Sequence, residues 1–167
     1  MAKLPVRKFP DPVLREKCGP VETFDSELFQ LLDDMAETMY AENGIGLAAP
    51  QVGVSQQITV IDVGEENPNL LEFINPQIVA RDGNTPSEEG CLSIPEYRDT
   101  IKRSERVTVR ALDRTGSTFE VEADDLFAIC LQHEIDHLNG VLFIDHLSPL
   151  KRALFKKWLK KRGPYEE

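Results

Sequence analysis

The chain has 167 residues, of which 41% are hydrophobic and 29% are charged, and its formal net charge is −10. This length and composition predict one globular domain and argue against a disordered or fibrous chain. The acidic charge disfavours specific DNA binding, and the sequence contains neither a run of about 20 apolar residues for a membrane span nor the apolar region of a secretory signal.

The first predicted helix covers residues 25–42, where apolar residues recur at helical spacing. Asp25 or Ser26 can cap this helix, and Asn43-Gly44 is a signal that stops it. A glycine-rich loop over residues 44–53 follows. Its glycines allow another chain to approach the backbone closely, or allow positive φ angles.

Strands are predicted where apolar and β-branched residues cluster or alternate, at 58–63, 70–74, 77–80, 106–112 and 117–121. Asn75-Pro76 is expected to break the chain between the second and third of these strands. The turn residues 113–116 are expected to join the last two strands into a hairpin.

Residues 124–138 predict a helix that is apolar nearly all round and is therefore buried. Ser148-Pro149 predicts the start of a final helix, and Gly163-Pro164 predicts its end. The order of elements predicts an α+β fold, with mixed or antiparallel sheets around the buried helix and with N-terminal and C-terminal helices.

The predicted buried helix contains an H-E-x-x-H pattern at His133, Glu134 and His137. Helical residues four positions apart lie on one face, so the two imidazoles can bind one metal ion. The intervening Glu134 can then handle protons for a water molecule on that ion. The alternative is a helix that happens to carry two surface histidines.

A catalytic site of this kind needs a third protein ligand, and the spacing leaves several candidates open. His146 follows an apolar run and fits a partly buried histidine near a strand end better than it fits a ligand. Cys18 has no supporting motif, and the apolar neighbours of Cys130 favour a buried structural thiol. Cys91 lies in a glycine-marked turn that suits a thiolate ligand. Acidic residues are further candidates.

Three segments resemble, in order and in separation, the three motifs of peptide deformylases: Gly44-Ile-Gly-Leu-Ala-Ala-Pro-Gln51, Glu89-Gly-Cys-Leu-Ser93 and Gln132-His-Glu-Ile-Asp-His137. Many unrelated metalloenzymes share H-E-x-x-H, whereas the three motifs in order are specific. The likeness runs from the N-terminus to residues 148–150. It implies that residues 1–167 form a single catalytic domain of this type.

The resemblance implies removal of the formyl group from N-formylmethionine at the start of newly made polypeptides, with release of formate. The cysteine of the second motif is a metal ligand in this family, so Cys91 would join His133 and His137. A metal-bound hydroxide would attack the formyl carbonyl. Glu134 would take the proton from the water and pass it to the departing nitrogen.

The resemblance also assigns groups around the substrate. Gln51, which would otherwise be interpreted as a turn cap, and the backbone N–H of Leu92 would donate hydrogen bonds to the carbonyl oxygen. The other substrate-binding positions would be Gly44, Ile45, Gly46, Glu89, Gly90, Leu126, Ile129, Cys130 and Arg98. Ile45 and Gly90 would pair with the peptide backbone. The methionine side chain would enter a pocket formed by Ile45, Glu89, Leu126, Ile129, Cys130 and the ring of His133. Arg98 either reaches further along the peptide or is a solvated charge.

One thiolate and two imidazoles suit one divalent ion, which can be Fe²⁺, Zn²⁺, Ni²⁺ or Co²⁺. The resemblance favours Fe²⁺, which would make the site oxygen-labile because the Cys91 thiolate can be oxidised.

Three cysteines cannot all pair within one chain, so they fit reduced thiols in a cytoplasmic protein. The compartment would be bacterial, or organellar if a transit peptide has been removed.

Residues 151–162 carry seven Lys/Arg and no acidic residue, which leaves a net charge of −17 on the rest of the chain. The cations either complement the dipole of a surface helix or dock on the ribosome, as the C-terminal helix does in some family members.

Three alternative functions stay open at this point. A metallopeptidase with the same helix would take its third ligand downstream, where His146 is the one histidine. A deformylase relative could act on another N-acyl group. A non-catalytic ribosome-binding protein is disfavoured, because such a protein has no need of a proton shuttle beside a metal.

Overall fold

The computed structural model describes residues 2–64 and 68–165, and it has the predicted α+β fold. The helices are α1 (Ser26–Ala41), α2 (Asp125–Leu138) and α3 (Pro149–Arg162), with 3₁₀ turns η1 (Pro12–Arg15), η2 (Ala49–Val52) and η3 (Phe143–His146). The strands are β1 (Gly46–Ala48), β2 (Ile58–Ile61), β3 (Leu71–Asp82), β4 (Thr85–Cys91), β5 (Ile94–Arg103), β6 (Arg106–Leu112) and β7 (Thr118–Asp124).

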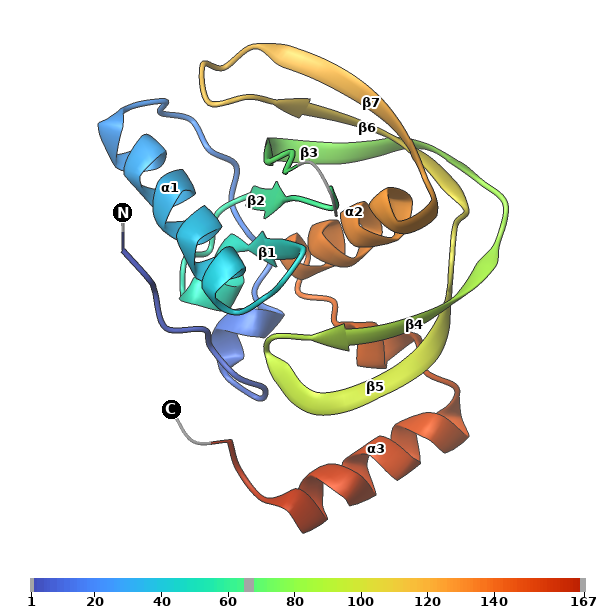
Figure 1. The fold of residues 1–167 in the computed structure, drawn as a ribbon. Helices are drawn as coiled ribbons and strands as arrows, with labels where there is room; N and C mark the ends of the chain where they lie inside the picture. Colours follow the sequence, from blue (N-terminus) through green and yellow to red (C-terminus); the bar gives the residue numbers. More distant parts are fainter. Residues whose placement is uncertain (1, 65–67, 166–167) are drawn as a thin grey trace.

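Helix α2 lies at the centre of the fold, between a five-stranded sheet and the β4–β5 hairpin (Figure 1). The sheet has the strand order β1-β2-β3-β6-β7, and all its pairs are antiparallel. The predicted burial of α2 is confirmed, because its residues Ala128, Leu131 and Ile135 share a core with Phe73 and Val109 of the sheet. That packing fixes one side of α2 and leaves the side with the histidines toward the hairpin.

Strand β3 runs through Asn75 without the predicted break. Its pairing with β6 shifts register between Ile74 and Gln77, and Asn75 has a φ of 52°. The Asn75 side chain accepts a hydrogen bond from Val21 N at 2.8 Å and donates one to Val21 O at 3.0 Å. The two predicted strands are therefore one strand with a bulge, which accommodates the proline without ending the pairing.

The β4–β5 hairpin has no counterpart among the predicted strands. The buried positions of β4 are Ser87 and Glu89, and a buried position of β5 is Arg103. Ile94 and Ile101 of β5 are also buried, but the inward-facing residues of β4 are polar and Arg103 interrupts the apolar series of β5, so a clear alternation of apolar and polar residues is absent here. The same polar positions supply much of the site described below.

The ends of α1 and α3 follow the predicted signals. Asp25 caps α1 by accepting a hydrogen bond from Leu28 N at 3.1 Å, and Ser148 caps α3 by accepting one from Lys151 N at 3.2 Å. Helix α3 ends at Gly163, which has a φ of 86°. Phe155 is the buried residue of α3, so one face of this helix is anchored while most of its cations are exposed. None of the described helices is both long and apolar enough to cross a membrane.

Candidate metal centre and active site

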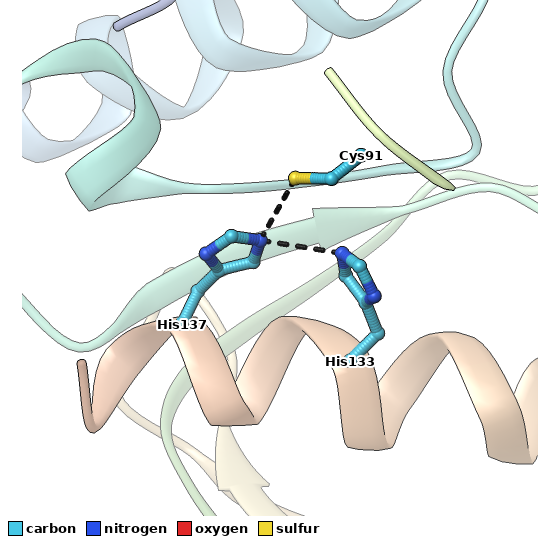
Figure 2. Close-up of side chains that lie close together, drawn as sticks. All are labelled: Cys91, His133 and His137. Atoms are coloured by element: carbon cyan, nitrogen blue, oxygen red, sulfur yellow. Dashed lines mark hydrogen bonds between the residues drawn. The ribbon is translucent and has the colours of Figure 1, made fainter. Parts of the chain in front are cut away.

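Three side chains from two elements converge at the centre of the molecule. His133 and His137 stand one turn apart on α2, and Cys91 is the last residue of β4 (Figure 2). The Nε2 atoms of the two histidines are 3.2 Å apart, and Cys91 Sγ lies 3.4 Å from His137 Nε2. All three candidate ligand atoms lie within 4.8 Å of one another. The structure therefore brings the three predicted ligands together.

The separations of 3.2 Å and 3.4 Å fit two ligand pairs around a single tetrahedral ion. Bond lengths of about 2.0–2.1 Å to imidazole and about 2.3 Å to thiolate place neighbouring ligand atoms about 3.3–3.6 Å apart. Burial holds the pKa of His137 well below its usual value, which favours the neutral imidazole that a metal ligand requires. The backbone N–H of Ser93 donates to Cys91 Sγ at 3.4 Å and so helps to fix the position of the sulfur. Three protein ligands leave one position of a tetrahedral ion open.

His133 is oriented by a buried carboxylate. Glu89 Oε1 lies 3.0 Å from His133 Nδ1, which leaves Nε2 directed toward the other ligands. Glu89 also accepts two hydrogen bonds from Arg103, each 2.8 Å long. Burial raises the pKa of Glu89, but its hydrogen bonds with Arg103 and His133 outweigh burial and lower the pKa to about 2. Glu89 was predicted to line the methionine pocket, and its contacts give it a second role in holding a ligand.

The sequence prediction missed Arg103 and Asp136. Arg103 also donates to Asp136 Oδ2 at 2.6 Å, so one guanidinium links β4, β5 and α2. Arg103 could have been identified from its position two residues after Ile101, because residues two apart in a strand point to the same face. Ile101 is buried, so Arg103 is a cation at a core-facing position of the strand. A buried arginine requires acidic partners, and these partners lie next to the candidate metal ligands.

Glu134 is buried beside the ligands, with 4% of its surface exposed. Its Oε1 atom has no hydrogen-bond partner within the described parts of the chain. Burial raises the pKa of Glu134 to about 7, and the charge of His133 offsets this only in part. A carboxylate with a free oxygen and a pKa near neutrality is suited to take up and release a proton.

Gly46 of β1 lets the backbone pack directly against Glu134. A Cβ atom at this position would lie 2.7 Å from Glu134 Oε2 and 2.8 Å from Cys130 Sγ. Both distances are too short for a side chain to fit without displacing its neighbours. The absence of a side chain at Gly46 is therefore a requirement of the packing around Glu134.

Gln51 points its amide group at the same centre from the 3₁₀ turn η2. Its Oε1 accepts a hydrogen bond from Ala48 N at 2.9 Å, which fixes the orientation of the amide. Its Nε2 donates to Ser93 Oγ at 3.2 Å and lies 3.6 Å from Cys91 Sγ. Gln51 thus serves as a turn cap and also presents an N–H group beside a ligand. Leu92 directly follows Cys91 in the β4–β5 turn and lines the same cleft.

A cleft of about 910 Å³ opens onto this centre. All the predicted substrate-binding residues line it, namely Gly44, Ile45, Gly46, Glu89, Gly90, Leu126, Ile129, Cys130 and Arg98. Ile45 and Leu126 expose 41% and 42% of their surfaces, which leaves apolar area available to a ligand. Arg98 is exposed on the rim, where it pairs with Glu88 at 3.3 Å.

The other candidate ligands lie outside the group of three. His146 Nε2 is 2.9 Å from Asp136 Oδ2, so His146 belongs to the Arg103 network, and it ends η3 rather than a strand. Cys130 is buried, and burial holds the pKa of its thiol well above the usual value. Cys18 is also buried, and burial raises the pKa of its thiol. The downstream histidine that a metallopeptidase would use is therefore engaged elsewhere.

Comparisons with known proteins identify the family of this chain. The family model for polypeptide deformylase matches residues 3–153. A peptide deformylase structure from Legionella pneumophila is 48% identical, with a TM-score of 0.88 over 98% of this chain and 100% of that chain. One from Thermotoga maritima is 45% identical, with a TM-score of 0.85 over 89% of this chain and 100% of that chain. One from Ehrlichia chaffeensis, solved in complex with actinonin, is 41% identical, with a TM-score of 0.92 over 99% and 100%. The chain belongs to the polypeptide deformylase family, whose members are enzymes that remove formyl groups.

Proposed function

We propose that this protein removes the formyl group from the N-formylmethionine of newly made polypeptides and releases formate. The proposal rests on the cluster of Cys91, His133 and His137. The buried carboxylate of Glu134 lies beside this cluster, and a cleft large enough for a peptide opens onto it. Family membership supports the same activity. In this proposal residues 1–167 act as one catalytic domain.

Cys91, His133 and His137 would hold one divalent ion, which we propose to be Fe²⁺, with Zn²⁺, Ni²⁺ and Co²⁺ as ions that the same donors accept. When bound, the ion acts as a Lewis acid that lowers the pKa of a water molecule to near neutrality. Glu89 keeps the His133 ring in its ligand orientation because it is ionised and hydrogen-bonded to Nδ1.

Glu134 is the proposed proton carrier. Its unpartnered Oε1 would accept the proton of the attacking water, and the same carboxyl group would then donate that proton to the amine nitrogen that leaves. A pKa raised to about 7 by burial suits both steps, because the group must gain and lose the proton in turn.

Gln51 and Leu92 are the proposed donors to the formyl oxygen. Negative charge develops on this oxygen as its carbon becomes tetrahedral, and fixed N–H groups stabilise the charge at little reorganisation cost. The amide of Gln51 is already fixed by its bond from Ala48 N, so its Nε2 is oriented before substrate binds. The backbone N–H of Leu92 is the second proposed donor, next to Cys91.

The substrate would bind as an added strand at the cleft. Gly44, Gly46 and Gly90 line the cleft, and Ile45 and Gly90 are the proposed pairing positions. The methionine side chain would lie against Leu126, Ile129 and Cys130, with Ile45, Glu89 and the ring of His133. Arg98 on the rim would contact residues further along the peptide.

The substrate implies a setting in which new polypeptides begin with formylmethionine. We propose the cytoplasm of a bacterium or the interior of an organelle, with nascent peptides as partners. The seven cations of residues 151–162 would hold α3 against ribosomal RNA, because most of them face solvent on an otherwise acidic protein.

The first test is formate release from a formyl-Met-Ala-Ser tripeptide by anaerobically purified protein loaded with Fe²⁺ or Ni²⁺. Wild-type protein is expected to release formate, and Glu134→Ala is expected to lose at least about 100-fold in kcat while still binding one ion, because it lacks the proton carrier. Absence of release by fully loaded wild-type protein, with cleavage of an unformylated peptide or of another N-acyl peptide, would replace the proposed substrate.

Gly46→Ala is expected to lower kcat by about 10- to 100-fold, since the added Cβ displaces Glu134 from its position beside the ligands. Gly19→Ala is the matched control, because no atom lies within 4 Å of the Cβ position at Gly19. The measurement is steady-state formate release at equal metal content. Equal activity of the two variants would show that the packing of Gly46 on Glu134 has no catalytic consequence.

The proposed ribosome contact is tested with α3 left in place, because its deletion would also remove the buried Phe155. One variant replaces four exposed lysines of α3 by glutamine: Lys156, Lys157, Lys160 and Lys161. The control makes the same change at four exposed cations elsewhere: Lys3, Lys17, Lys102 and Arg106. Co-sedimentation is expected to weaken at least about 10-fold in the α3 variant alone. Equal binding of both variants would contradict the contact.

A further inference from the structure

The β5 strand bulges opposite the metal ligand Cys91. In the hairpin, Glu89 pairs with Asp99 and Cys91 pairs with Ile94. The chain therefore advances two residues along β4 but five residues along β5 between these two pairs. The extra residues lie within 95–98, and Glu96 among them has a φ of 72°. A glutamate rarely adopts this left-handed conformation, which persists only where surrounding contacts hold it. The bulge therefore depends on its neighbours for its shape.

This bulge forms part of the cleft and backs the strand edge proposed for the substrate. Pro95, Glu96 and Tyr97 line the cleft. A Cβ atom at Gly90 would lie 3.4 Å from Tyr97 O and 2.8 Å from an Arg98 nitrogen, so the bulge rests directly on Gly90. A shift of the bulge would therefore move the edge that pairs with the peptide.

The C-terminal end of the chain holds the bulge at two residues. Tyr165 Oη donates a hydrogen bond to Pro95 O at 2.9 Å, and Arg162 Nε lies 3.0 Å from Glu96 Oε2. The Arg162 guanidinium also stacks on the Tyr165 ring, with Cζ 4.0 Å from the ring centre. The two side chains thus support each other and fix consecutive positions of the bulge.

The body of α3 holds the third position. The Tyr97 ring lies 4.7 Å from the ring of Phe155 and 4.9 Å from that of Trp158, centre to centre. Phe155 is the buried anchor of α3, so this contact ties the bulge to the best-fixed part of the helix. Tyr97 therefore connects α3 to the wall of the cleft.

From these contacts we infer that Arg162 and Tyr165 are positioning residues for substrate binding, which act through the Pro95–Tyr97 bulge on the Gly90 edge. The inference rests on the proposed deformylase function and adds the C-terminal segment to the residues that shape the substrate cleft. Arg162 and Tyr165 would set how well the peptide binds and leave the reacting groups unchanged.

The test is steady-state kinetics of formate release from formyl-Met-Ala-Ser by the double variant Arg162→Gln/Tyr165→Phe. Loss of one hydrogen bond and one ion pair is expected to raise KM about 3- to 10-fold, with kcat within about 2-fold of wild type. Tyr40→Phe is the matched control for removal of a tyrosine hydroxyl, because the Tyr40 hydroxyl donates a hydrogen bond to Asp62 at 2.6 Å. Arg110→Gln is the control for the ion pair, which there joins Glu120 at 3.1 Å.

A second comparison separates positioning from a general loss of structure. Arg162→Gln is expected to raise KM in the wild-type background and to have no further effect in a Glu96→Gln background, because its ion-pair partner is then neutral. An unchanged KM in the double variant, a fall in kcat alone, or equal changes in the controls would overturn the inference. Wild-type protein that releases no formate would overturn the proposed function itself, whatever the variants do.

Discussion

The buried guanidinium of Arg103 is the interaction on which the geometry of the site depends. It makes two hydrogen bonds to Glu89 on β4 and one to Asp136 on α2 while its own backbone belongs to β5. Removing such charges from water costs several kcal/mol per ion unless their partners are correctly placed. The β4–β5 hairpin therefore has one favourable position against α2. Because Cys91 lies two residues after Glu89, that position also brings the thiol to the two histidines of α2.

Two buried carboxylates near the metal centre are given different roles by their surroundings. Glu89 has Arg103 and His133 as partners, and these lower its pKa to about 2, so it stays ionised and holds a ligand. Glu134 has one oxygen without a hydrogen-bond partner among residues 2–64 and 68–165, and burial raises its pKa to about 7. The two pKa values differ because the carboxylates have different hydrogen-bond and charge partners. A difference in burial is not the cause, since both side chains are almost completely buried. One carboxylate thus has a structural role and the other remains available for proton transfer.

Most of the helices and the two histidines of the candidate metal site could be predicted from the sequence, because caps, periodicity and the H-E-x-x-H spacing are local signals. The third ligand could not be chosen from spacing, since Cys91 approaches His133 only after β4 folds against α2, and its assignment came from resemblance. The β4–β5 hairpin escaped prediction because several of its inward-facing residues are polar, and two of these, Glu89 and Arg103, are charged. The same polar positions obscure the strand pattern and form part of the candidate site. The strands of the hairpin were therefore missed at the place where functional residues replace apolar ones. The bulge at Glu96 depends on contacts from the C-terminus, which no local pattern encodes.

In the proposed function, Cys91, His133 and His137 together bind one divalent ion at the cleft. X-ray absorption of protein loaded with one equivalent of Co²⁺ measures this directly, because sulfur is distinguished from nitrogen and oxygen by its longer bond of about 2.3 Å. The expected spectrum of the wild-type protein shows one sulfur and two imidazole nitrogens bound to the ion. In Cys91→Ser the sulfur neighbour is expected to be lost. A spectrum without sulfur, with two sulfurs, or unchanged in Cys91→Ser would contradict this account.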